Sequence, residues 1–305
     1  MIVRKKENWF RMLFVWHGSV LPALLPRLSL LFALSLVVAY FHGIIFSFKI
    51  PLNTAPLTLF GFVLALFLGF RNNVSYDRYW EGRKLWGSLL NVSRSLTRQA
   101  LTLGSPAATQ IAVAEFVSLQ SAFLYALKHQ LRNTDGHDDL QSRLVPEQFE
   151  VVYASKYKPV LLIKLMAEWI GKAREEGRVD MIQQARFDEN LDKLEDIVGG
   201  CERIVSTPIP YSYRVLLHRT VYIYCLLLPF GLVDALDWFM PLIVVFIAYT
   251  FVAFEAIADE IEEPFGTEAN DLALNSMCQM IDETIHELIG KRIETKQQAI
   301  HNIIH

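Results

Sequence analysis

The sequence predicts an all-α integral membrane protein with four transmembrane helices per subunit and a large helical cytoplasmic region. The chain has 305 residues, is 52% hydrophobic and has a mean hydropathy of +0.27, which is too apolar for an ordinary soluble enzyme. Its 20% charged residues are too many for a protein that lies wholly in lipid. Long uncharged runs occur in two pairs, and apolar residues at helical spacing fill the stretch between them.

The first pair of uncharged runs covers residues 28–48 and 50–70. Each run would be about 31 Å long as a helix, close to the thickness of one hydrocarbon core. The second pair covers 220–233 and 238–254 and is joined by the short acidic link 234–237, which predicts a helical hairpin. Because the run from 220 is short, we expect its helix to begin earlier and to include Tyr222, Arg219 and His218, whose side chains can reach a membrane interface.

The region between the two pairs predicts a body of helices. Apolar residues recur at helical spacing over 76–101, 111–131, 145–173 and 179–204, with turn signals at 104–106 and 133–136. Lys158-Pro159 predicts a break in the third segment, and Gly199-Gly200 predicts an interruption near the end of the fourth. A final amphipathic helix is expected over about 272–289.

The distribution of Lys and Arg predicts that both termini and the central region are cytoplasmic. Residues 1–27 carry five basic and one acidic side chain, and residues 71–98 carry six basic and two acidic. The link at residue 49 has only Lys49, and the 234–237 link has no basic residue. No cleavable signal is evident behind the basic opening.

Several function classes find no support in the residues. The cysteines Cys201, Cys225 and Cys278 show no paired spacing, so neither disulfides nor zinc are expected. The net charge of −3 and the lack of a basic stripe argue against nucleic acid. No phosphate loop or nucleophile elbow is present, so we expect no enzyme activity and no cofactor. His301 and His305 are four apart but lie at the C-terminus, where fraying is the default.

These observations predict five consecutive regions. Residues 255–271 hold seven acidic and no basic side chains, which sets them apart from the membrane run before them. The regions are a cytoplasmic N-terminal segment (1–27), transmembrane helices 1 and 2 (28–70), a helical cytoplasmic region (71–213), transmembrane helices 3 and 4 (214–254), and a cytoplasmic acidic turn with a C-terminal helix (255–305).

Two stripes run along the second membrane segment. Small residues four apart predict close packing against neighbouring helices: Gly61, Ala65 and Gly69. One position further on, large apolar residues form a ridge that rises about 12 Å: Phe62, Leu66 and Phe70. Such a ridge can face lipid or a protein core. It can also line a pore when several copies surround an axis, where apolar rings gate by dewetting.

Three separated motifs identify a family resemblance. The stretches "FLGFRNNVSYDRYWEGRKLWG", "GGCERIVSTPIPYSY" and "EEPFGTEANDL", with "WHGSVL" near the N-terminus, resemble the bacterial branch of the bestrophin family over about residues 8–285. The resemblance implies a homopentamer around one axial pore in the bacterial inner membrane, with monovalent ions and the bilayer as its other partners. It also implies that Phe62, Leu66 and Phe70 line a narrow neck.

The resemblance raises the question of a metal site and of a second constriction. Animal bestrophins build a calcium clasp after the Pro-Phe-Gly motif, but here only Glu268 and Asp271 fall at corresponding places. A hard cation needs six to eight oxygen ligands, so we expect no calcium gating. A solvated acidic turn with helix capping is the favoured interpretation of 255–271, and a vestigial cation site at Glu268 and Asp271 is the alternative. Ile182 is a candidate for a second, cytosolic constriction, although packing in a helical core is the favoured interpretation of a lone Ile in an amphipathic segment.

Three functions are compatible with the sequence. The leading one is a channel that prefers monovalent cations, because the bacterial branch is associated with cations and the acidic segment 255–271 would attract them. The alternative within the family is a chloride or anion channel of the same architecture. A membrane-anchored helical scaffold or sensor is the alternative of another class. A secondary transporter is disfavoured, because the chain shows no inverted repeat.

Overall fold

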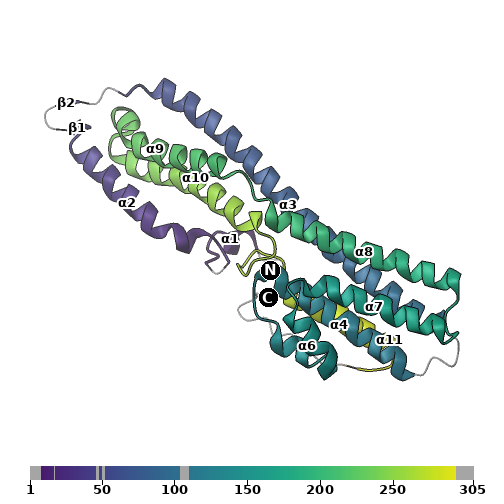
Figure 1. Cartoon of the computed structure of the whole chain (residues 1–305). Coiled ribbons are helices and arrows are strands. Elements are labelled where there is room, and N and C mark those ends of the chain that lie inside the picture. The colour runs from purple at the N-terminus through teal and green to yellow at the C-terminus, as the bar shows by residue number, and fades with distance from the viewer. Residues whose placement is uncertain (1–7, 17, 46–47, 50–51, 104–109, 293–305) are drawn as a thin grey trace. The chain divides into compact units, whose positions relative to one another are not determined.

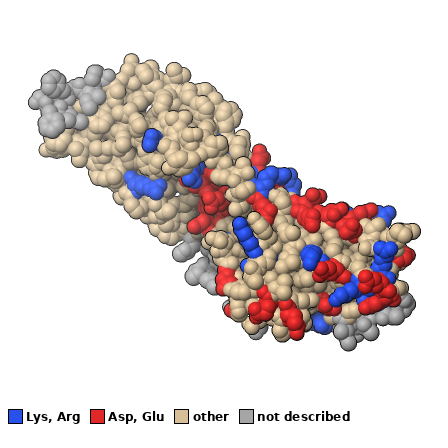
Figure 2. Space-filling model, in the orientation of Figure 1, with Lys and Arg blue, Asp and Glu red and all other residues tan. Residues whose placement is uncertain are grey.

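The computed structural model describes residues 8–16, 18–45, 48–49, 52–103 and 110–292 (Figure 1). The chain divides into two compact units. One, called the membrane unit here, comprises the described residues of 8–79 and 208–263. The other, called the second unit, comprises the described residues of 80–207 and 264–292. On the face drawn in Figure 2, charged side chains are few in the membrane unit and numerous in the second unit.

The membrane unit is built from long apolar helices. Its elements are α1 (Trp9–Met12), α2 (Leu21–Tyr40), a hairpin of the two-residue strands β1 (Ile44–Ile45) and β2 (Phe48–Lys49), the first part of α3 (Thr54–Thr102), α9 (Tyr211–Leu236), the 3₁₀ turn η1 (Asp237–Phe239) and α10 (Met240–Glu262). Helix α10 packs against α2 and α9, and apolar side chains of these three helices form most of the core (Figure 1). The all-α class is confirmed.

The ends of the first two membrane helices differ from the uncharged runs. Helix α2 begins at Leu21, includes Arg27 and ends at Tyr40 rather than continuing to residue 48. His42 and Gly43 then adopt left-handed φ angles of 47° and 75°, and the Gly43 N–H donates to the Val38 carbonyl at 3.0 Å, which closes the helix end. Helix α3 likewise begins at Thr54 rather than at residue 50.

The hairpin predicted for the second pair is present as α9 and α10. Helix α9 begins at Tyr211, which confirms the expected extension ahead of the apolar run. Among the described residues, three helical stretches are long and apolar enough to cross a membrane: Leu21–Tyr40, Thr54–Thr102 and Tyr211–Glu262. The last of them contains both α9 and α10, so the separate helices agree with the two expected pairs.

Helix α3 continues without a break for 49 residues, so the second membrane segment and the first helix of the predicted helical body are one element (Figure 1). No proline follows Pro56 in it, and this permits the uninterrupted helix. The remaining helices of the second unit are α4 (Gln110–Arg132), α5 (His137–Gln141), α6 (Pro146–Ala154), α7 (Lys158–Glu175), α8 (Met181–Ser206) and α11 (Leu274–Leu288). Its core includes the Phe116 and Trp169 rings, whose centroids lie 4.6 Å apart.

The predicted turns have mixed outcomes. The break at Lys158-Pro159 is confirmed, because α6 ends at Ala154 and Pro159 lies in the first turn of α7. The interruption at Gly199-Gly200 is wrong, since α8 runs through both glycines to Ser206. A Cβ on Gly200 would lie 2.9 Å from Leu85 Cδ2, so close helix packing explains this glycine. The turn signal at 104–106, the basic residues 4–6 and both C-terminal histidines, 301 and 305, lie outside the described residues.

Candidate functional site

The apolar ridge of α3 points away from the core of its own subunit. Phe62, Leu66 and Phe70 are 69%, 47% and 53% exposed. Leu64 and Leu68, which are buried, each follow a ridge residue by two positions, or about 200° around the helix. The ridge is therefore not part of the buried core of this chain.

The stripe of small residues divides into two parts. Gly61 packs inside the subunit, because a Cβ there would lie 2.9 Å from Cζ of Tyr224 on α9. Ala65 is exposed, and a Cβ on Gly69 would meet nothing within 4 Å in this chain. Within the described residues, Ala65 and Gly69 thus leave the side of α3 beside the ridge open to close approach by another helix.

The acidic segment 255–271 is partly neutralised by partners in the membrane unit. The buried Glu255 carboxylate lies 2.7 Å from Nδ1 of His218. Arg71 forms ion pairs with Asp259 and with Glu262, whose Oε2 lies 3.4 Å from Nη2 of the arginine. For three of the seven acids, the premise that the segment lacks compensation is therefore wrong, because their partners lie in parts of the sequence far from this segment.

The vestigial cation site has a different role in the structure. Asp271 is buried, and its Oδ2 accepts the Glu268 backbone N–H at 2.7 Å, so this carboxylate closes a turn. Glu268 is exposed. In the parts of the chain that are described, no group of three or more His, Cys, Asp or Glu side chains is arranged to hold a metal ion.

Ile182 lies on the first turn of α8 and is 77% exposed. The favoured interpretation, that it packs in a helical core, is therefore wrong. Its neighbour Met181 is 69% exposed, so the start of α8 presents two adjacent apolar side chains. Asp180 caps this helix by accepting the Gln183 N–H at 2.8 Å, which fixes where the pair projects.

A polar cluster in the second unit was not predicted from the sequence. It joins α4 and α11 to the segment after α5, and its centre is Arg143. The Arg143 guanidinium carbon lies 3.6 Å from the centroid of the Tyr125 ring, its Nε donates to Ser121 Oγ at 2.9 Å, and its Nη2 lies 3.3 Å from Asp282 Oδ2. His286 Nδ1 completes the group at 3.0 Å from Asp282 Oδ1.

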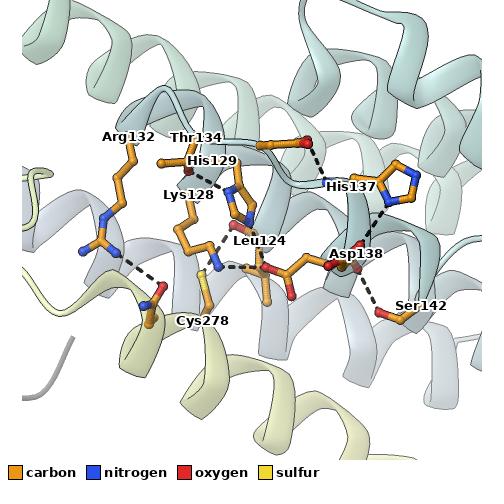
Figure 3. A network of polar contacts seen from close by, with 12 residues as sticks. Leu124, Lys128, His129, Arg132, Thr134, His137, Asp138, Ser142 and Cys278 are labelled. Atoms are coloured by element: carbon orange, nitrogen blue, oxygen red, sulfur yellow. Dashed lines mark hydrogen bonds and ion pairs between the residues drawn. The ribbon is translucent and has the colours of Figure 1, made fainter. Parts of the chain in front are cut away.

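A second part of the network surrounds Asp139. The Asp139 carboxylate lies 2.9 Å from Nζ of Lys128 and 2.8 Å from Nε2 of His129. His129 Nδ1 lies 2.7 Å from Thr134 Oγ1 (Figure 3). Burial alone would raise the pKa of Asp139, but the hydrogen bonds from His129 and Lys128 hold that pKa well below its usual range. These contacts fix the loop between α4 and α5.

The Asp282–His286 pair makes the second unit sensitive to pH. Burial alone would lower the pKa of His286, but its hydrogen bonds to Asp282 raise that pKa above the ordinary value. Proton binding therefore favours the folded state. The stabilisation is complete below about pH 6.5, the ordinary His value, and is lost as pH rises through the raised pKa of the folded state.

We expect wild-type thermal stability to fall more steeply between pH 6 and 8 than that of His286→Gln. The glutamine can keep a hydrogen bond to Asp282 but cannot titrate. Thermal unfolding of both proteins across this range, followed by circular dichroism, measures the difference. Parallel profiles for the two proteins would contradict a contribution from His286.

Comparison with known proteins identifies the family. Residues 1–287 match the family model described as Bacterial/Fungal Bestrophin protein. The chain belongs to the bestrophin family, as its motifs predicted. Bestrophins are ion channels rather than enzymes, so the expectation of no enzyme activity agrees with the family.

Two relatives and one solved structure illustrate the similarity. A voltage-dependent anion channel-forming protein of Ralstonia nicotianae is 54% identical over 291 residues, which cover 95% of each chain. The voltage-dependent anion channel-forming protein YneE of Escherichia coli K12 is 41% identical over 282 residues, or 92% of each chain. A bacterial bestrophin homologue from Klebsiella pneumoniae has a TM-score of 0.85 at 40% identity, covering 88% of this chain and all of that one.

Proposed function

We propose that this protein is a bestrophin-type channel in which α3 helices from several copies surround an ion path. Phe62, Leu66 and Phe70 line its neck as stacked apolar rings. The observation that supports this is the position of the ridge, which is exposed and opposite the buried face of α3. Apolar rings of this kind oppose the passage of hydrated ions and can gate by dewetting.

The proposed assembly is a homopentamer with four transmembrane helices per subunit in the bacterial inner membrane. The lengths of α2, α9 and α10 and of the apolar part of α3 support four crossings. The bias of Lys and Arg supports cytoplasmic termini. The open side of α3 at Ala65 and Gly69 supports close contact between neighbouring copies. The exposed Ile182 supports the proposal of a second constriction on the cytoplasmic side.

Anions are the proposed permeant ions. Both relatives above carry the printed name of voltage-dependent anion channel-forming proteins. The sequence favoured cations because of the acidic segment, but Glu255, Asp259 and Glu262 are paired with His218 or Arg71. This pairing weakens the main physical argument for cations, and the apolar ridge carries no net charge of its own.

Recordings in planar bilayers with a KCl gradient test this function. We expect current from the purified protein, with a reversal potential close to the chloride equilibrium potential. A reversal potential near the potassium equilibrium potential would contradict anion preference and restore the cation alternative. The absence of any ion flux from reconstituted protein would contradict the channel itself and favour the scaffold.

A further inference from the structure

Glu262, the last residue of α10, is a point where three segments of the membrane unit meet. Its side chain is only 4% exposed. One carboxylate oxygen, Oε2, lies 3.4 Å from Nη2 of Arg71, and the other, Oε1, accepts the Ile209 N–H at 3.3 Å. Its backbone carbonyl accepts a hydrogen bond from Nε of Arg78 at 3.0 Å. Glu262 thus links α10 to two positions on α3 and to the segment before α9.

Arg71 is the partner on α3, and it follows the neck residue Phe70 directly. The Arg71 side chain is fully buried and pairs with both Asp259 and Glu262. One residue later, Asn72 Nδ2 donates to the Phe254 carbonyl on α10 at 3.2 Å. A buried guanidinium is costly to leave without its carboxylates, so these contacts hold one orientation of α3 against α10.

The orientation of α3 is also the orientation of the ridge. Because a helix turns as a rigid body, rotation that moved Phe70 toward or away from the ion path would turn Arg71 by the same angle. Arg71 would then leave Asp259 and Glu262. One rotation of α3 would therefore change both the Arg71 ion pairs and the position of Phe70 in the neck.

We infer that Arg71 and Glu262 are positioning residues that set the rotation of α3 and thereby the state of the neck. This inference rests on the proposed channel function. Glu262 stands next to the point where the chain leaves the membrane unit at Glu263, and Ile209 lies just after the point where it enters at Pro208. A displacement of the chain at Glu263 or at Pro208 would act on the Glu262 carboxylate. Through the ion pair with Arg71, it would rotate α3 and so gate the neck.

Single-channel recording of the wild type and four variants tests the inference. Glu262→Gln and Arg71→Met each remove one member of the pair, and we expect each to change the open probability roughly fivefold or more. The double variant should differ from wild type by no more than the larger single effect, since the two residues act through one contact. Glu263→Gln removes a neighbouring but exposed carboxylate and should leave the open probability unchanged.

The outcomes separate this inference from the proposed function. Wild-type current with unchanged open probability in both single variants would overturn the inference alone. Independent effects that multiply in the double variant would also overturn it. If a variant of the buried pair does not assemble, Asp259→Asn provides another test, because Asp259 is the other partner of Arg71 and its own side chain is 48% exposed. Wild-type gating of the Asp259→Asn channel would overturn the inference too. Absence of wild-type current would instead overturn the channel proposal.

Discussion

Replacing Phe70 with alanine is expected to raise the single-channel current or the open probability about tenfold. The reason is that each copy would lose one phenyl group from the proposed neck, the narrowest apolar part of the path. A barrier lowered by about 1.4 kcal/mol is enough for this effect. Leu66→Ala should act in the same direction, since the two side chains belong to one ridge. Recording from purified variants in planar bilayers measures both quantities.

The control for the neck variants is Phe246→Ala. Phe246 lies on α10 and is 68% exposed, compared with 53% for Phe70, so a phenylalanine ring that is at least as exposed is removed from a different helix. We expect wild-type conduction from it. Unchanged conductance and open probability in both Leu66→Ala and Phe70→Ala would refute the assignment of the neck.

Asp282→Asn is expected to lower the free energy of unfolding of the second unit by about 3 kcal/mol. Asp282 is 7% exposed at its side chain and faces both Arg143 and His286, so the substitution leaves two cationic groups without their charge partner. Removal of one partner from a buried pair costs about 3–5 kcal/mol, and the partial exposure of Arg143 places this case at the lower end. Chemical denaturation followed by circular dichroism measures the change.

Glu287→Gln on the same helix provides the comparison for Asp282. Glu287 is exposed, and its substitution should change the unfolding free energy by no more than about 0.5 kcal/mol. Equal midpoints for the two variants would show that the Arg143 cluster does not stabilise the second unit. The burial of Asp282 would then reflect packing alone.

The sequence predicted the helices well where the signal is local. Hydrophobic runs and helical spacing identified the membrane pairs and the body, and Pro159 marked a helix start because proline fits the first turn. The residues at which α2 begins and ends were harder to predict from the sequence. Arg27 directly precedes the uncharged run 28–48, yet it lies within the helix, where its Nη1 donates to the Tyr222 hydroxyl on α9 at 2.8 Å. Gly200 was wrongly predicted to break its helix, because the side chain that packs against it, Leu85 on α3, is far away in the sequence.

The candidate site was predictable as far as helical periodicity reaches. A spacing of four residues placed Phe62, Leu66 and Phe70 on one face, and the structure leaves that face exposed. The pairing of Arg71 with Glu262 joins residues 191 positions apart, and that of Arg143 with Asp282 joins residues 139 apart. No local pattern encodes such contacts. The net charge of a segment therefore overstated the charge that the folded acidic region presents.

Thiol labelling of single cysteine substitutions during recording tests most directly whether the ridge lines the ion path. The native Cys201, Cys225 and Cys278 are buried, and burial raises the pKa of the Cys201 and Cys278 thiols to about 12, so background reaction is small. A charged methanethiosulfonate reagent should change the current through Phe62→Cys and Phe70→Cys channels but not through Phe246→Cys channels. Currents that respond at Phe246→Cys and stay constant at both ridge positions would contradict the account.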